Sequence, residues 1–299
     1  HISISADGRL IAYSSVLSTT NVQRAGFDPV RGAMAGEPEW LTRGTRRWAN
    51  PAPSPDGRYV VFYSLVEPEG DLYVMRADGV GSPRQVTRDS GSDRVPRWSP
   101  DGEWIAAFSD RGGPLQLWKI RPDGSGLTQL TDEPENIAYA VWSPDGSRMA
   151  GATTRLDSAH AFIFDPTRPW RAQQPQWLPQ PPDSLVPFAP HSWSPDGRRL
   201  AGMIAATDQG VVVHTLGTAR YDRLTTFGEW PVWLPDSRRL LFVSGGNALY
   251  VVDRETRAVR KVFEVTHDVI GPPQLTPNGR TMYYTRRTTE ADIWLATLN

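Results

Sequence analysis

A four-residue turn motif that recurs along the whole chain constrains the fold more than any other feature. Counted between the Asp or Asn of successive copies, the spacings are 49, 45, 44, 51, 40 and 42 residues. A period of this length is typical of a four-stranded propeller blade and is too long for a short helical repeat. The full copies, Ser-Pro-Asp-Gly, begin at Ser54, Ser99, Ser143 and Ser194, and three degenerate copies begin at Ser5, Leu234 and Thr276. The seven copies predict an all-β fold, a seven-bladed β-propeller of four-stranded blades.

Each copy of the turn is flanked by segments that favour short strands. A β-branched or aromatic run such as Tyr59 to Tyr63 follows the turn. Proline presets φ in the turn, and glycine takes the positive φ that other residues resist. No segment has a long apolar period of 3.6 residues, so we expect very little helix. The tryptophans that precede four of the turns are expected to pack between neighbouring blades: Trp98, Trp142, Trp193 and Trp233.

The spacing divides a single domain into seven predicted blades. Their boundaries are residues 1–45, 46–90, 91–134, 135–183, 184–227, 228–266 and 267–299. The last unit stops after its third strand, whereas the first unit begins with its innermost strand. An N-terminal strand can therefore complete the last blade. Alternatively, the last blade keeps three strands and an open edge.

Composition excludes several classes of function. The net charge is −1, which gives no basic surface for nucleic acid or an anionic membrane. The longest apolar run, residues 59–66, is far shorter than the ~20 residues that span a bilayer. The chain has no cysteine, which excludes disulfides and thiol chemistry and is compatible with an oxidising compartment. We therefore expect no nucleic-acid partner and no membrane insertion of this segment.

The repeat resembles the TolB-type, WD-repeat-like propeller unit of bacteria. The resemblance is carried by Trp142 to Gly146, by strands such as Asp71 to Met75, and by the closing Gln-Leu-Thr. The segments Phe27 to Pro29 and Gly36 to Thr42 resemble a blade that is common in TolB-like proteins. The resemblance implies an extracytoplasmic binding module, periplasmic or secreted. Some relatives join the propeller through a membrane segment to a kinase or DNA-binding module. TolB itself has an additional α/β domain and six blades, so its role is not transferred.

Polar and aromatic side chains ahead of the turns are predicted to gather at one mouth of the central channel. Aromatic rings with convergent Arg, His and carboxylate groups suit a polar ligand or a peptide. The insertion from Pro179 to Pro190 lies next to this set and is interpreted as a partial lid or as a plain blade connection. The predicted ligand-binding residues are Trp48, Asp93, Arg94, Arg97, Tyr139, His191, Glu229, Trp230 and His267.

Catalytic signatures are missing from the sequence. It contains no G-x-S-x-G, H-E-x-x-H, G-x-G-x-x-G or P-loop motif. His191 and His267, with Glu229 or Asp268, could supply ligands for Mn²⁺ or a similar ion. Oligogalacturonate lyase, a TolB-like relative, is a metal-dependent enzyme, but its histidine cluster is not recognisable here. We predict no catalytic residue, no metal and no cofactor.

The sequence favours a non-enzymatic binding, sensing or scaffold propeller. Its partner is expected to be a protein, a peptide or a saccharide at the channel mouth, and the chain is expected to be a monomer. One alternative is a metal-dependent polysaccharide lyase or hydrolase. Another is the extracytoplasmic sensor of a longer kinase or transcription-regulator chain. A propeller by itself specifies no function, so the site has to decide.

Overall fold

The computed structural model describes residues 2–7, 9–65, 70–154, 160–181, 188–204 and 210–297. Five sheets have four antiparallel strands each, which follow one another in chain order. The first is β5 (Trp48–Pro53), β6 (Tyr59–Ser64), β7 (Leu72–Arg76) and β8 (Arg84–Gln85). The second is β9 (Asp93–Trp98), β10 (Ile105–Ser109), β11 (Gln116–Ile120) and β12 (Thr128–Gln129). The third is β13 (Ile137–Trp142), β14 (Met149–Thr153), β15 (Ala161–Phe164) and β16 (Gln176–Trp177).

The fourth sheet is β17 (Phe188–Trp193), β18 (Arg199–Ile204), β19 (Val211–Thr215) and β20 (Tyr221–Arg223). The fifth is β21 (Glu229–Trp233), β22 (Arg239–Ser244), β23 (Ala248–Asp253) and β24 (Val259–Glu264). Among the described residues, the single helical element is the 3-10 turn η1 (Trp170–Ala172), as the missing helical periodicity predicts. These five sheets correspond to the predicted units from 46–90 to 228–266.

A sixth sheet combines the two ends of the chain. β2 (Leu10–Asp28) pairs along its length with β27 (Thr281–Thr297), from Leu10 opposite Thr297 to Gly26 opposite Thr281. β25 (Val269–Ile270) and β26 (Gln274–Leu275) flank β27, while β3 (Ala33–Met34) and β4 (Glu39–Trp40) flank β2. β1 (Ile2–Ile4) forms a hairpin with the start of β2. An N-terminal strand therefore completes the last blade, as one of the two predicted closures requires.

Apolar clusters between successive sheets show that the ring is closed. Six clusters of buried residues occur in the described part of the chain, and each joins neighbouring sheets. Phe27 and Tyr284 pack on Leu241 of the fifth sheet, and on the other side Val22 and Tyr283 belong to the cluster of the first sheet. The all-β propeller of four-stranded blades is thereby confirmed.

All seven turns form, but the first and seventh repeats share one sheet. The described residues therefore form six separate sheets, rather than one for each repeat. The reason lies in residues 17–20 and 287–290, which read Leu-Ser-Thr-Thr and Arg-Thr-Thr-Glu. Neither segment contains the Gly, Pro, Asn or Asp that reverses a chain, so β2 and β27 each continue as one strand where the repeat predicts two.

The tryptophans before the turns pack against the preceding sheet, as expected from the repeat. Trp98 lies in the cluster of the first sheet and donates a hydrogen bond from Nε1 to Ala52 O at 3.2 Å. Trp142 repeats the contact one sheet further on, with its Nε1 at 3.4 Å from Arg97 O. Trp193 and Trp233 are buried in the clusters that join their sheets to the preceding ones. Burying such a ring contributes on the order of a few kcal/mol.

The Ser-Pro-Asp-Gly turn is held by a local hydrogen-bond set. In the third sheet, the Ser143 hydroxyl donates to Asp145 Oδ1 at 2.6 Å and accepts from the Arg148 backbone N–H at 2.9 Å. The Ser147 backbone N–H donates to the same carboxylate oxygen at 3.0 Å. These bonds explain the aspartate as a structural residue of the turn.

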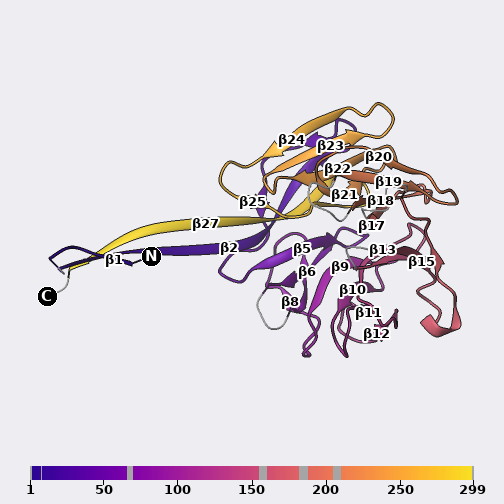
Figure 1. The fold of residues 1–299 in the computed structure, drawn as a ribbon, viewed down its shortest axis with the longest axis horizontal. Helices are drawn as coiled ribbons and strands as arrows, with labels where there is room; N and C mark the ends of the chain where they lie inside the picture. Colours follow the sequence, from indigo (N-terminus) through magenta and orange to yellow (C-terminus); the bar gives the residue numbers. More distant parts are fainter. Residues whose placement is uncertain are drawn as a thin grey trace.

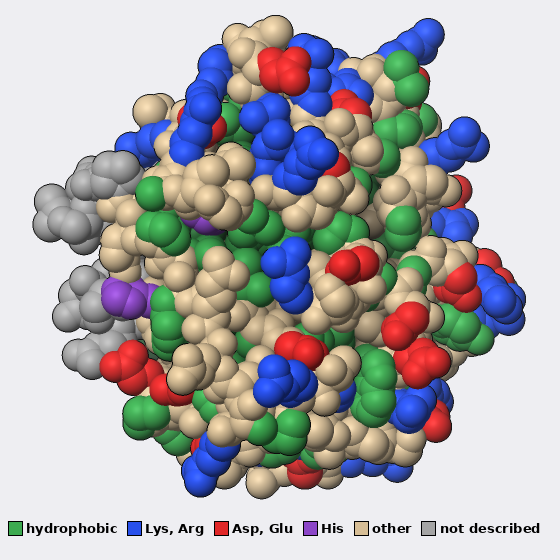
Figure 2. Space-filling model, turned by 90° about the vertical axis from the view of Figure 1, so that its right-hand side faces the viewer, with side chains coloured by type: hydrophobic (Ala, Val, Ile, Leu, Met, Phe, Trp, Pro, Cys, Tyr) green, Lys and Arg blue, Asp and Glu red, His purple; other side chains and the backbone are tan. Residues whose placement is uncertain are grey.

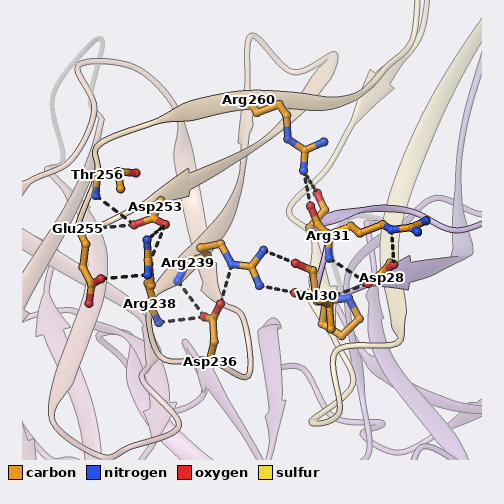
Figure 3. A network of polar contacts seen from close by, with 12 residues as sticks. Asp28, Val30, Arg31, Asp236, Arg238, Arg239, Asp253, Glu255, Thr256 and Arg260 are labelled. Atoms are coloured by element: carbon orange, nitrogen blue, oxygen red, sulfur yellow. Dashed lines mark hydrogen bonds and ion pairs between the residues drawn. The ribbon is translucent and has the colours of Figure 1, made fainter.

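Backbone carbonyls of residues 29–32 join the sixth sheet to the fifth (Figure 3). The Arg239 guanidinium donates to Val30 O at 2.8 Å, and Arg260 donates to Gly32 O at 2.9 Å. Gly32 has φ +61°, and a Cβ there would lie 3.4 Å from Arg239 Nη1. The segment after Phe27, which resembles part of a TolB-like blade, therefore connects the fifth and sixth sheets and helps to close the ring.

An arm projects from the ring and carries both ends of the chain (Figure 1). It consists of residues 2–19 and 288–297, in which β1, β2 and β27 form a three-stranded ribbon. Apolar side chains are exposed along it, with Ile2 and Leu295 each 73% accessible and Val16 63% accessible. The arm is the part of the first and last repeats that the ring does not contain.

Engineered cysteines can test the pairing in the arm. Counted from the bond Phe27 N–H to Arg280 O, the antiparallel ladder makes Val16 and Ala291 a non-hydrogen-bonded pair. Such pairs have the Cα separation that a disulfide needs. In this cysteine-free chain, the double variant Val16→Cys/Ala291→Cys should oxidise within the monomer, as measured by thiol titration and non-reducing electrophoresis. The pair Val16→Cys/Thr289→Cys is the control out of register. Free thiols in the first variant after oxidation would instead support separate first and last blades.

The turn aspartates should make the fold sensitive to acid. The Ser143 hydroxyl, together with the Ser147 N–H and hydroxyl, lowers the pKa of Asp145 from 3.8 to about 2. The stabilisation is complete above the unfolded value and is lost as the pH falls from about 4 to about 2. Asp145→Asn should therefore lower Tm at pH 5, and the difference should shrink toward pH 2 in circular-dichroism melts. Asn278, which already accepts from Thr276 Oγ1 at 2.8 Å, offers the reverse control, Asn278→Asp. A pH-independent difference would contradict this account.

Candidate functional site

β-bulges interrupt the innermost strand in each of the five four-stranded sheets. In four of them, the residue four positions before the start of the turn motif has a left-handed backbone, with φ between 46° and 66°: Asn50, Val95, Tyr139 and Trp230. A non-glycine residue in this region costs on the order of 1 kcal/mol or more. Bulges re-aim side chains, and these four occur at the same position of each repeat, around the axis of the ring.

Proline changes the bulge in the fourth sheet. In the fourth sheet, Pro190 occupies the position that corresponds to Tyr139. Its ring fixes φ near −65° and excludes the left-handed conformation. The irregularity there falls between Pro190 and Ser192, at His191. His191 is only 5% accessible, and no hydrogen-bond partner satisfies its buried Nε2 atom. The sequence therefore places an imidazole at the centre of the ring, with one nitrogen unused.

A cavity of about 570 Å³ occupies the channel at the end where the turns lie. Prolines from five of the turns surround it: Pro55, Pro100, Pro144, Pro195 and Pro277. The residues two positions before the turns reach it from four sheets: Arg97, Val141, Ser192 and Gln274. His191 also lines it, together with the tryptophans of the second, third and fourth sheets. Five of the six sheets thus contribute to one concave site.

Arg97 is the charged residue of this cavity. Its guanidinium donates from Nη1 to Pro96 O at 2.9 Å. Among the described residues, no carboxylate lies within ion-pair distance of it, and burial lowers its pKa to about 10. Burial also lowers the pKa of His191, to about 3, and the nearby charge of Arg97 acts in the same direction. At neutral pH the site therefore holds a cationic guanidinium beside a neutral imidazole.

The aromatic rings of Tyr139 and Trp230 pack against the imidazole of His191. Their ring centroids lie 4.8 Å and 4.4 Å from that of the imidazole. Burial raises the pKa of the Tyr139 phenol. Glu229, next to Trp230, is half-buried, and its pKa is raised by burial. The structure thus brings Arg97, Tyr139, His191 and Trp230 into one neighbourhood, with Glu229 at its edge.

The other predicted binding residues lie in different surroundings. Trp48 is buried between the sixth and first sheets, with its ring 4.9 Å from Phe62. Asp93 is 2% accessible and forms an ion pair with Arg111 at 2.5 Å. Arg94 is half-buried, and its charge acts on the Tyr63 phenol. His267 is exposed on the segment before β25.

Val141, Ser192, Gln274 and the turn prolines are site residues that the sequence did not predict. A signal for the first three exists, because each stands at the same offset, two residues before its turn motif. The predicted lid from Pro179 to Pro190 falls largely on residues 182–187, which lie outside the described residues.

The predicted alternative of a metal site involves His191 and His267, with Glu229 or Asp268. The Asp268 carboxylate forms an ion pair with Arg286 at 2.6 Å. In the described residues, no three His, Cys, Asp or Glu side chains come close enough to hold a metal ion. Over the same ranges, no helix has the length and apolarity needed to cross a bilayer.

Surface cations contrast with Arg97. Lys and Arg side chains gather over the upper part of the face in Figure 2, where Figure 1 places β20 to β24. Arg238 in this region pairs with Asp253 at 2.7 Å, and Lys261 pairs with Glu264 at 3.0 Å. Such exposed pairs contribute little binding specificity. Arg97 differs because it lies partly buried in the channel and, among the described residues, has no carboxylate partner.

Because His191 is buried in its neutral form, it should make the free energy of unfolding depend on pH. The unfolded chain takes up a proton near pH 6.5, whereas folded His191 does so near pH 3. Stability is therefore highest above pH 6.5 and falls as the pH decreases through this window, by about 1.4 kcal/mol per pH unit at most. His191→Gln should reduce that slope in denaturant titrations between pH 7 and pH 4.5. Ser192→Ala, in the same bulge, should leave the slope unchanged. Equal slopes in wild type and His191→Gln would show that His191 is not buried as described.

Solved structures with a similar fold include TolB proteins. A putative TolB from Agrobacterium tumefaciens has a TM-score of 0.73 and 18% identity, with 92% of this chain and 99% of that chain covered. TolB from Acinetobacter baumannii has a TM-score of 0.62 and 15% identity, with 89% and 63% covered. Oligogalacturonate lyase from Vibrio parahaemolyticus has a TM-score of 0.55 and 13% identity, with 91% and 98% covered. At these identities the similarity concerns the fold.

Sequence comparison places the chain in a family. A search among curated proteins gives no match. Residues 3–169, more than half of the chain, match the TolB beta propeller domain. The repeat, the closed ring and this match agree, and the chain belongs to the TolB beta propeller domain family.

Proposed function

We propose that this propeller is a non-enzymatic binding module that takes a segment of a protein or peptide partner into the central channel. The observation that supports it best is the cavity of about 570 Å³ framed by five sheets, which Arg97 and His191 line and to which the described residues contribute no carboxylate. The stacked sheets hold these groups in place before a ligand arrives, so little ordering entropy is lost on binding. We propose an extracytoplasmic location, periplasmic or secreted, for this function.

The enzymatic alternative has less support. The lyase among the structural neighbours shares the fold at 13% identity. A metal-dependent lyase or hydrolase at this site would use His191 with His267, but one is buried in the channel and the other is exposed near β25. The described lining of the cavity includes Arg97, His191 and three serines, but no Asp or Glu that could act as a base there.

A peptide selection tests the proposal. A random seven-residue phage library would be selected on the wild-type protein, and the enriched peptides would be measured against two variants. Gln274→Trp places a large ring in the cavity, so it should weaken the enriched peptides by about tenfold or more. Val80→Trp, on an exposed loop residue that is 64% accessible, is the matched control and should not. No enrichment, or equal binding to Gln274→Trp, would overturn channel binding.

A further inference from the structure

We infer that the group recognised inside the channel is a carboxylate of a peptide or protein segment, held by the Arg97 guanidinium. The inference rests on the proposed function and adds the chemical class that the site selects. Its basis is a charge imbalance in the cavity, together with the polar residues and the apolar rim that line it.

The charge imbalance is specific to Arg97. The residues that line the cavity include no Asp and no Glu, so its positive charge has no compensation from the described lining. A desolvated charge without a partner is costly, whereas a guanidinium and a carboxylate form two parallel hydrogen bonds. Arg111, one strand away, shows how this chain pairs a buried arginine: it binds Asp93 at 2.5 Å and Asp89 at 2.7 Å. In the channel, the ligand has to supply the acid.

Further polar residues line the same space. His191 and Gln274 are both part of the cavity wall, although the Nε2 atom of His191 is itself buried. Ser192 donates its hydroxyl to Pro231 O at 2.7 Å, so its oxygen can still accept but its proton is used. Arg97 and Gln274, whose side chains carry N–H donors, line the cavity from the second and sixth sheets. Donors from different sheets suit an acceptor-only group with two oxygens, which a carboxylate is.

A single cation favours a monoanion. A phosphate at neutral pH carries more charge than one guanidinium neutralises, and the excess would remain in a desolvated site. The rim favours a peptide over a saccharide, because prolines and indoles surround the entrance and leave few donors for sugar hydroxyls. An aspartate or glutamate side chain, or a C-terminal carboxylate with apolar neighbours, fits both parts of the site.

The inference also predicts how the free protein responds to losing the charge. Arg97→Met keeps the length of the side chain and removes a cation that has no partner in the described residues. In the absence of ligand, this variant should therefore unfold at a higher temperature than the wild type. A lower Tm for Arg97→Met would mean that the guanidinium is structural, and would overturn the inference. Arg94→Met is the matched control, because Arg94 lies on the same strand and outside the cavity.

Small probes test the chemical class. N-acetyl-glutamate amide and N-acetyl-glutamine amide differ only in the carboxylate, so each would be titrated with Tm as the readout. At ten times its Kd, the glutamate probe should raise Tm by roughly 2–5 °C, while the glutamine probe gives at most a small shift. Arg97→Met should lose the response, Arg97→Lys should retain part of it, and Arg94→Met should keep it.

The other outcomes separate the inference from the proposed function. Equal shifts with both probes would overturn carboxylate selectivity and leave channel binding intact. A larger response to inorganic phosphate, or to galacturonate without a response to the glutamate probe, would replace the carboxylate peptide by another ligand class. Peptides that the phage selection enriches and Gln274→Trp weakens, but that contain no acidic residue or free C-terminus, would likewise support the channel and reject the carboxylate.

Discussion

Ring closure by the pairing of β2 with β27 is the contact on which the remaining structure depends. A four-stranded sheet with two apolar faces has to be covered on both sides, and only a closed ring gives every sheet two neighbours. The sixth sheet supplies Phe27, Met282 and Tyr284 to one side and Val22 and Tyr283 to the other. Each such side chain contributes about 1.5–3 kcal/mol on burial, so opening this one pairing would expose two clusters at once.

Local chemistry explains why the repeat could be recognised from the sequence. The Ser143 and Asp145 side chains bond within the turn itself, and Trp142 needs only the preceding sheet to find its packing site. These contacts lie within one repeat or between successive repeats, where a periodic pattern reports them directly. The strand order of the five middle sheets follows for the same reason, because neighbouring strands in the chain also pair in space.

Contacts between the ends of the chain could not be predicted in the same way. Whether the chain turns within residues 10–28 depends on competing long-range pairings. Leu17 to Thr20 contains no Gly, Pro, Asn or Asp, and β27 supplies a partner for β2 from Leu10 to Gly26. A difference of a few contacts then decides whether the first repeat forms a separate blade or joins the last repeat in the sixth sheet. The periodicity of the sequence does not measure that difference.

The candidate site could be predicted from the sequence only in part, because an alignment does not show where the backbone is irregular. Alignment ahead of the turns found Arg97, Tyr139, His191 and Trp230, but it treated Trp48 and Asp93 as equivalent, although both are committed to packing and ion pairing. The β-bulges distinguish the residues near the channel from those in the core, because a bulge directs some side chains toward the axis of the ring and others into the core. Val95, with φ 52°, and the desolvated Arg97 lie in the same strand, and each is unfavourable for folding alone. Arg97 has no carboxylate partner among the described residues and lines the cavity, so its position is better explained by the ligand that we propose the cavity binds.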